Sequence, residues 1–504
     1  MRVVQNPQMQ IGEVDISKMT FDLKSRDDIP KILRGLQHLY MDLALRTKLF
    51  ALLEKRIAPK LDKRNGRPGM ALWTIFVCGV MRLDLNIDYD RLLELVNHHD
   101  TLREMLGHGD FDKAPYHIQT LKDNVSLLEP ELLDDINQLI VSAGHELLKK
   151  KDGEALRGRC DSFVVETDVH FPTDINLLYD AMRKVITGTA QWCERREVSD
   201  WRQHKYNVRH VKRYMRTAQN SKRSKAQSEE QQKKNAARII VAHQDYLDLA
   251  RHYLDKATAT LAMLVQRGCV SQSDVVAKLD IEGFMDHAKR QIEQTERRVI
   301  LGETIAHDEK VFSLFEPHTE WVSKGKAGVP VELGVKVCIL EDQHQFILHH
   351  QVMEKKTDDQ VTVSMVTEAK KRFPALNACS FDKGFHSPAN QAALKETLEL
   401  VALPRKGKLS QQAQAVEQSA EFLKARRAHS AVESAINALE VHGLDMCRDH
   451  GIDGFKRYVA LAVVTRNIHR IGAILWKREQ EQAQAQERRK SRHGDRAPPQ
   501  KHAA

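Results

Sequence analysis

The sequence predicts an α/β protein in which a mixed sheet is preceded by an all-α region and interrupted by a long helical insertion. Strand-like segments rich in apolar and β-branched residues occur in two separate blocks, one near residue 160 and one from 320 to 403. Helical periodicity dominates the residues before, between and after these blocks. With 504 residues, the chain is long enough for more than one domain and a sizeable core.

Composition narrows the class of protein. The formal net charge is +9, with 29% charged and only 6% aromatic residues, which favours a helix-rich protein that meets a polyanion. The seven cysteines are dispersed without a C-x-x-C pair, which argues against a disulfide framework and against structural zinc. Neither a secretory leader nor an apolar run of membrane-spanning length is visible, so we expect a cytoplasmic protein with no membrane partner.

Residues 1–150 predict helices. After a basic turn cluster at 63–69, three short apolar stripes at helical spacing cover residues 72–83, 86–96 and 100–107. Three short helices with tight turns fit a helix-turn-helix module for DNA, although a plain helical bundle would give the same spacing. A longer helix over 131–148 follows.

The first strand covers residues 160–167 and carries Asp161 inside an apolar run. A lone acid in a strand is costly unless it is paired, exposed or bound to a metal. Asp168 or Asp174 could instead be the functional acid of this segment. Residues 176–300 then predict an antiparallel helical insertion whose basic centre, 205–225, is either a solvated face or a track for a DNA backbone.

The second block alternates apolar and polar residues over 331–339, the clearest strand pattern in the chain. A buried strand at 378–381 ends on Asp382, and Gly384 allows the chain to turn. Catalytic groups collect at such carboxyl ends of strands in open α/β sheets. The remaining elements predicted here are a strand at 346–352, a helix at 358–371, a helix at 391–397, a strand at 398–403, a helix that carries Glu433, and an apolar helix at 455–476.

This order of elements is that of a ribonuclease H-like five-stranded mixed sheet with a third acid on a following helix. The predicted organisation is a helical DNA-binding region at 1–150, a catalytic domain at 151–175 and 301–476, a helical insertion at 176–300, and a disordered basic tail at 477–504.

Several segments resemble those of a known family. CDSFVVETDVHFPTD, SFDKGFHSP and the pair RRAHSAVESAINALEVHGL and FKRYVALAVVTRNIHRI are similar to the three acidic blocks of bacterial insertion-sequence DDE transposases of the ISNCY-like family. The resemblance extends to GRPGMALWTIFVCGVMRLDL near the N-terminus and covers nearly the whole chain.

The resemblance implies that Asp161, Asp382 and Glu433 hold two Mg²⁺ ions, for which Mn²⁺ can substitute, and that Glu440 is the alternative third acid. It implies DNA cleavage at transposon ends followed by strand transfer into target DNA. The partners would be double-stranded DNA, both terminal inverted repeats and target, bound by a homodimer. The protein would lie in the bacterial cytoplasm, associated with the nucleoid when bound to DNA.

Basic residues near the predicted metal face are candidates for DNA contact. In place of the family's Tyr-Arg-Glu-Lys pattern around the last acid, this chain has Arg426, His429 and Glu440 at the Tyr, Arg and Lys positions, and His429 is the candidate substitute for the missing Arg. The full set is Lys324, Lys326, Lys383, Arg405, Arg426, Arg427 and His429. Two further functions fit the same sequence: a catalytically inactive DNA-binding protein derived from a transposase, and a related metal-dependent nuclease.

Overall fold

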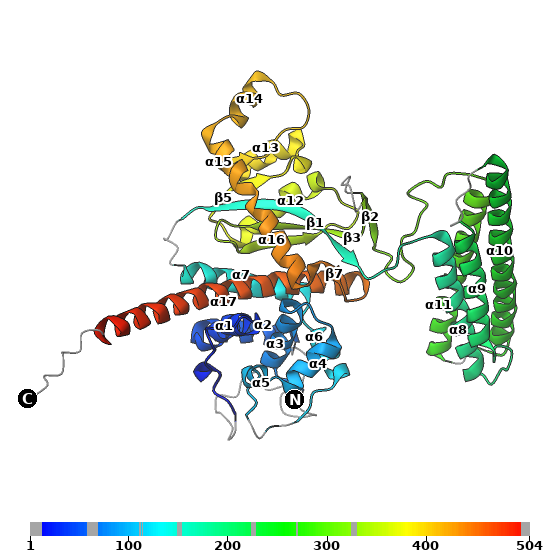
Figure 1. Ribbon diagram of the computed structural model, residues 1–504, viewed down its shortest axis with the longest axis horizontal. Helices are drawn as coiled ribbons and strands as arrows, with labels where there is room; N and C mark the ends of the chain where they lie inside the picture. Colours follow the sequence, from blue (N-terminus) through cyan, green and yellow to red (C-terminus); the bar gives the residue numbers. More distant parts are fainter. Residues whose placement is uncertain are drawn as a thin grey trace, which may run out of the picture. The chain divides into compact units, whose positions relative to one another are not determined.

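A computed structural model of the chain describes residues 13–57, 69–109, 112, 114–148, 154–222, 228–268, 271–323 and 330–494. The chain divides into two compact units, one formed by Met1–Asp168 together with Val322–Ala504 and the other by Val169–Trp321. The first unit holds nearly all of the sheet, and the second is helical (Figure 1).

The N-terminal part of the first unit is helical, as predicted. After a short 3₁₀ turn, η1 (Ile16–Lys18), its helices are α1 (Ile29–Met41), α2 (Leu43–Ile57), α3 (Leu72–Asp84), α4 (Tyr89–His98), α5 (Asp100–Met105), α6 (Ile118–Val125) and α7 (Pro130–Leu147). One hydrophobic core runs from these helices into the sheet and the last helix. The N-terminal helices therefore belong to the same compact unit as the sheet.

The sheet is mixed, open and seven-stranded, in the order β2-β3-β1-β5-β6, with β4 also paired to β3 and β7 to β1. Strand β3 is antiparallel to β1 and β4, whereas β5 and β7 are parallel to β1 and β6 is parallel to β5. The strands are β1 (Leu156–Thr167), β2 (Glu320–Ser323), β3 (Val331–Glu341), β4 (Ile347–Val352), β5 (Leu376–Phe381), β6 (Leu400–Ala402) and β7 (Met446–Cys447). The prediction of five strands is wrong by two, because β2 and β7 are too short to show a period of two.

Helices cover both faces of this sheet (Figure 1). Helix α7 and the long α17 (Gly451–Gly494) contact β4 on one side, and α12 (Asp358–Arg372) contacts β3, β4 and β5. The remaining helical elements of this unit are η3 (Lys383–Phe385), α13 (Pro388–Thr397), α14 (Gln411–Glu417), α15 (Ala420–His429), α16 (Ala431–Leu439) and η4 (Glu440–Leu444).

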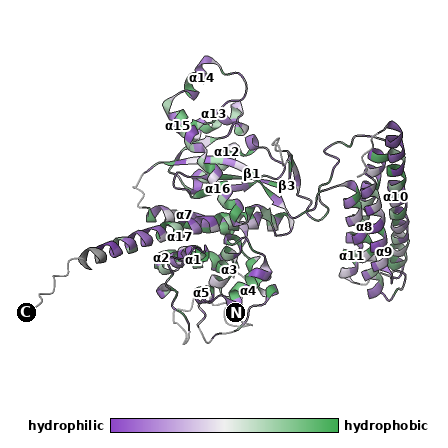
Figure 2. Cartoon of the chain, in the orientation of Figure 1, coloured by the Kyte–Doolittle hydropathy of each residue, from purple (hydrophilic) through white to green (hydrophobic). Residues whose placement is uncertain are grey.

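Helix α17 corrects the prediction of a disordered tail from residue 477, because the helix continues to Gly494. Its buried apolar part ends at Trp476, and the following stretch is hydrophilic (Figure 2). Glutamate, glutamine, alanine, arginine and lysine fill this stretch. Such polar and charged residues are typical of disordered segments, but most of them also have high helix propensity. The same composition is therefore compatible with a solvated helix.

The second unit contains four long helices, α8 (Asp174–Arg195), α9 (His204–Ser221), α10 (Glu229–Gln266) and α11 (Gln272–Thr295), followed by the short π-helix η2 (Glu296–Ile300). Its own core includes the fully buried rings of Trp192, Trp201 and Tyr246. Helix α8 begins where Thr173 accepts a hydrogen bond from the backbone N–H of Asn176, an N-cap. The predicted insertion, 176–300, lies inside this unit. Among the described residues of the whole chain, none of the helices has the length and apolarity needed to cross a membrane.

Candidate active site at the ends of strands β1 and β5

Two of the predicted acids are brought together by the register of two parallel strands. The last paired residues of β1 and β5 are Cys160 and Phe381, and Asp161 and Asp382 come directly after them. Both carboxylates line one pocket of about 320 Å³. Strand β5 ends at this point, whereas β1 continues to Thr167, so Asp161 lies within its strand and Asp382 directly after its own. The parallel pairing of β1 with β5 thus brings two residues 221 positions apart to the same pocket.

The two carboxylates have different environments. The pKa of Asp161 is raised to about 6, chiefly by burial; the N–H of Ser162, 2.7 Å from Oδ1, opposes the shift, and the neighbouring Asp382 adds to it. Asp382 follows the buried Phe381 but is itself 66% exposed at the side chain. The site therefore combines a half-buried carboxyl that stays protonated up to about pH 6 with an exposed carboxylate whose pKa is lowered.

His429 on α15 accounts for the behaviour of Asp382. Its Nε2 lies 3.2 Å from Asp382 Oδ1, and its Nδ1 lies 3.1 Å from Ser380 Oγ. The hydrogen bond from His429 lowers the pKa of Asp382, more than burial raises it, and the charge of Arg426 lowers it further. Ser380 and His429 thus orient the acid at the end of β5.

A third carboxylate in the pocket, Asp358, was missed by the sequence analysis. It lies in the first turn of α12, where a capping box between Thr357 and Gln360 begins the helix. Its Oδ1 accepts a hydrogen bond of 2.7 Å from the Ser162 hydroxyl, and Lys336 Nζ lies 3.4 Å from both carboxylate oxygens. The sequence predicted a helix at 358–371; only the packing of α12 against β3 and β5 directs its first turn at the pocket.

The structure does not bring Glu433 into this pocket. Glu433 is exposed in the first turn of α16, a helix that contacts β1, and it is not among the pocket-lining residues. His429 and Glu433 lie on different helices, because α15 ends and α16 begins at Ser430. Glu440, the second candidate for the third acid, lies further along the chain at the start of η4.

The two acids that could have replaced Asp161 lie elsewhere. Asp168 is exposed just beyond the end of β1. Asp174 belongs to the helical unit, where its carboxylate pairs with Arg298 at 2.8 Å. Neither residue lines the pocket, so Asp161 is the acid that this strand supplies.

The candidate DNA-contacting residues differ in exposure. Lys383, Arg405, Arg426 and Arg427 are exposed in the part of the unit that carries Asp382. His429 is only 8% exposed and faces the acid, so its contacts are within the protein. Lys324 and Lys326 lie outside the described residues.

Among its described residues, the predicted helix-turn-helix region exposes few basic side chains; the basic cluster at 63–69 lies outside them except for its last residue. All residues of α3 are buried, so this helix belongs to the core. The exposed positions of α4 include Asp90, Arg91 and Glu94, a mixed set. In the second unit, by contrast, α9 exposes Lys205, Arg209, Arg213 and Arg216 at steps of four, four and three residues, which places four cations along one helical face.

The donor set of the pocket suits a hard divalent cation. Mg²⁺ takes oxygen ligands, retains several waters, and is held by one or two carboxylates plus phosphate oxygens in phosphoryl-transfer sites. Asp161 and Asp382 supply two such carboxylates, while Asp358 already pairs with Lys336.

In comparisons with family models, with curated proteins and with solved structures, no match to this chain was found.

Proposed function

We propose that the chain is a DDE transposase, an enzyme that cleaves DNA at transposon ends in a metal-dependent reaction and transfers the strand into target DNA. The observation that carries the proposal is the meeting of Asp161 and Asp382 at one pocket. One acid lies within the first strand and the other directly after a later strand, the two positions that the resemblance to insertion-sequence transposases assigns to the first two acids.

The topology around the pocket supports a ribonuclease H-like catalytic domain. Five of the strands run in the order β4-β3-β1-β5-β6, with β3 antiparallel and β5 parallel to the central β1. In this proposal, the helical unit is the insertion that follows the first strand, and the N-terminal helices assist in binding DNA.

The proposed cofactor is Mg²⁺, held by Asp161 and Asp382. The resemblance makes Glu433 the third ligand, a role that would require α16 to move, because Glu433 lies outside the pocket. Two bound divalent ions would stabilise the attacking and leaving oxygens of an in-line phosphoryl transfer. The residues of the chain would hold these ions and set the charge of the ligating carboxylates. His429 keeps Asp382 ionised and oriented, and Asp161 must release its proton before it can act as a ligand, because a ligating carboxylate is deprotonated.

The proposed partner is double-stranded DNA, as terminal inverted repeats and as target. The exposed cations Lys383, Arg405, Arg426 and Arg427 would contact phosphates near the pocket, and the basic face of α9 would contact DNA from the second unit. Pairing two transposon ends would require two protomers, hence a homodimer in the DNA complex, acting in the bacterial cytoplasm at the nucleoid.

The test is a cleavage assay on duplexes that carry the inverted repeats bracketing the gene, with Mg²⁺ or Mn²⁺. We expect the wild type to nick the repeat end, leaving a 3′-OH, and to join it to target DNA. Asp382→Asn should retain DNA binding and lose cleavage, because the amide keeps the shape but loses the charge. Asp359→Asn is the matched control, since Asp359 is the neighbour of Asp358 but does not line the pocket.

The remaining outcomes point to different functions. Binding without nicking by the wild type would identify an inactive DNA-binding protein, and nicking without joining would identify a nuclease. Cleavage that survives in Asp382→Asn would show that the pocket is not the active site.

A further inference from the structure

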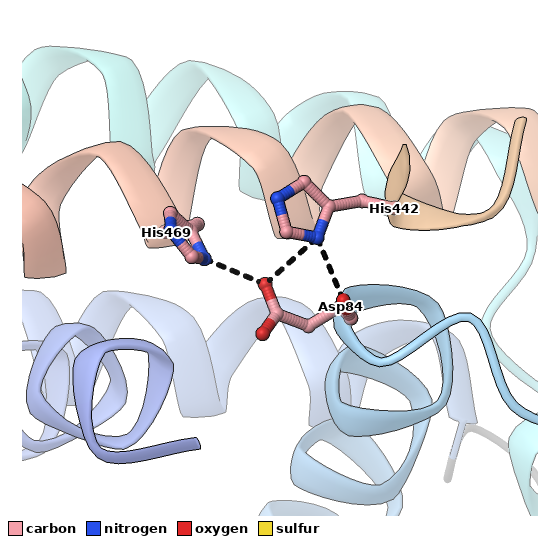
Figure 3. Close-up of side chains that lie close together, drawn as sticks. All are labelled: Asp84, His442 and His469. Atoms are coloured by element: carbon pink, nitrogen blue, oxygen red, sulfur yellow. Dashed lines mark hydrogen bonds and ion pairs between the residues drawn. The ribbon is translucent and has the colours of Figure 1, made fainter. Parts of the chain in front are cut away.

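A second cluster of potential ligands lies away from the pocket described above, in the helical part of the first unit. Asp84 is the last residue of α3, His442 lies in η4, and His469 lies within α17. Figure 3 shows both imidazole rings beside the Asp84 carboxylate. One ligand atom from each residue lies within 4.8 Å of the other two, and among the described residues this is the one group of three or more histidine, cysteine, aspartate or glutamate side chains gathered so closely.

Three segments far apart in the sequence build this cluster. Helix α3 contacts α17, and η4 contacts both. The chain turns at Gly443 with φ of +101°, where a Cβ would lie 3.1 Å from both Leu83 Cδ1 and Tyr458 Oη. Glycine is needed for this backbone conformation and for the close approach of η4 to α3. The position of His442 beside Asp84 is therefore fixed by the backbone.

The distances are close to those of a metal site. His469 Nδ1 lies 2.8 Å from Asp84 Oδ1, and His442 Nδ1 lies 3.6 Å from the same oxygen and 2.6 Å from the backbone carbonyl oxygen of Asp84, to which it donates a hydrogen bond that coordination by this nitrogen would replace (Figure 3). Donors bound at roughly 2.0–2.1 Å in a tetrahedral zinc site lie about 3.3 Å from each other. The two observed separations bracket this value, so small rotations of the side chains would suffice for joint coordination.

Within the described part of the chain, the Asp84 carboxylate is bonded through one oxygen only, to His469, with the buried Arg466 as a further charged neighbour. Its side chain is 0% exposed, and its Oδ2 has no hydrogen-bond partner among the described residues. A buried carboxylate oxygen without a partner is costly. Asp342 provides the comparison: it is equally buried beside His145, but its Oδ2 lies 2.6 Å from His145 Nε2 and its Oδ1 accepts two backbone N–H bonds.

We propose that Asp84, His442 and His469 bind a borderline divalent transition-metal ion such as Zn²⁺. Two imidazoles and one carboxylate are a donor set for Zn²⁺, Fe²⁺, Co²⁺ or Ni²⁺ rather than for Mg²⁺. The dispersed cysteines argue only against a cysteine-based zinc site, and this cluster contains no cysteine. The ion would fasten α3 and η4 to α17 and so stabilise the first unit when bound.

The experiment uses the full chain without an affinity tag, freed of metal by chelation and titrated with Co²⁺ as a spectroscopic probe, with Zn²⁺ as competitor. We expect one tightly bound Co²⁺ per chain, intense visible absorption from low-symmetry coordination, displacement by Zn²⁺, and a higher melting temperature with either ion. His469→Gln keeps a polar group but removes the ligand, so affinity should fall more than about 100-fold, beyond the loss typical of outer-shell changes. His442→Gln should have the same effect.

Two controls separate this site from others. His145→Gln alters a histidine–aspartate pair of equal burial whose carboxylate is satisfied, and Asp382→Asn alters the proposed Mg²⁺ pocket; both should retain Co²⁺ binding. Absence of stoichiometric Co²⁺ binding by the wild type would overturn the proposal and leave the cluster as a hydrogen-bonded network. Unchanged affinity in both His469→Gln and His442→Gln would overturn it as well.

Discussion

The imidazole Nε2 of His429 lies 3.2 Å from the Oδ1 of Asp382, and its Nδ1 lies 3.1 Å from Ser380 Oγ. One ring nitrogen therefore contacts the strand residue Ser380 and the other contacts the acid that follows the strand. The ring is thereby held between the strand and the acid at its end. The sequence suggested His429 as a DNA-contacting residue, but its position makes it a positioning residue for the pocket.

Replacing His429 should change the pH dependence of cleavage. Because the histidine lowers the pKa of Asp382, His429→Leu should raise that pKa and move the acid limb of the pH–rate profile to higher pH. Activity at neutral pH should fall about 10- to 100-fold, the usual effect of losing a partner that orients a ligand. His386→Leu is the control, since the ring of His386 lies against the backbone N–H of Lys406 instead. An unmoved acid limb in His429→Leu would contradict the assignment.

Asp161 should limit stability above pH 6 when no divalent ion is present. Its pKa in the folded protein is about 6, above the ordinary value of 3.8, so the folded state binds the proton more tightly than the unfolded state. Stability therefore falls as the pH rises from about 4 to 6 and stays lower above it. Asp161→Asn removes this cost, and the variant should be more stable than the wild type at pH 7 by up to about 3 kcal/mol.

Chemical denaturation in a chelating buffer at pH 4 and pH 7 measures the difference. The gain in Asp161→Asn should vanish near pH 4, where the wild-type carboxyl is protonated. Asp168→Asn, an exposed residue one position beyond the same strand, should show no gain at either pH. Equal stability of Asp161→Asn and wild type at pH 7 would mean that the carboxylate is not penalised by burial.

Glu433 and Glu440 can be distinguished by parallel substitutions. Glu433 lies in the first turn of α16, which contacts β1, the strand of Asp161, whereas Glu440 lies beyond the end of that helix. We expect Glu433→Gln to abolish cleavage as Asp382→Asn does, with DNA binding unchanged, and Glu440→Gln to retain it. A gel assay of nicking and a separate binding assay measure the two effects. The reverse result would transfer the third role to Glu440.

Where α1 crosses α17, replacing a glycine by alanine should lower the free energy of unfolding, although alanine has the higher helix propensity. A Cβ on Gly472 would lie 2.1 Å from the backbone oxygen of Lys31, and one on Gly35 would lie 2.5 Å from the backbone oxygen of Ile468. Gly472→Ala should therefore destabilise the first unit by roughly 1–3 kcal/mol, as overpacking does, despite the better helix propensity of alanine.

The matched control is Gly283→Ala in α11, where a Cβ would meet nothing within 4 Å. This helical position should gain about 0.5–1 kcal/mol. Calorimetry of the two variants should show melting temperatures that move in opposite directions. A stabilised Gly472→Ala would show that the two helices are not in backbone contact.

Local patterns predicted most elements of the fold. The helix over 358–371 and the alternating strand over 331–339 are confirmed as α12 and β3, because apolar periodicity reports the face that each element buries. The strand that ends before Asp382 is confirmed as β5 for the same reason. The sequence did not predict the short β7 or the helical continuation of α17, because neither has an apolar pattern of its own.

The sequence by itself determined that Asp161 and Asp382 stand on strands, because the apolar runs around them are local. Only the tertiary structure decided that the two acids share a pocket with Asp358, that His429 faces Asp382, and that Glu433 stays outside. It alone also brought Asp84 to His442 and His469. These contacts depend on strand register and helix packing between residues that are mostly far apart in the sequence. A periodic pattern shows which face of an element is buried, but not which distant element packs against it.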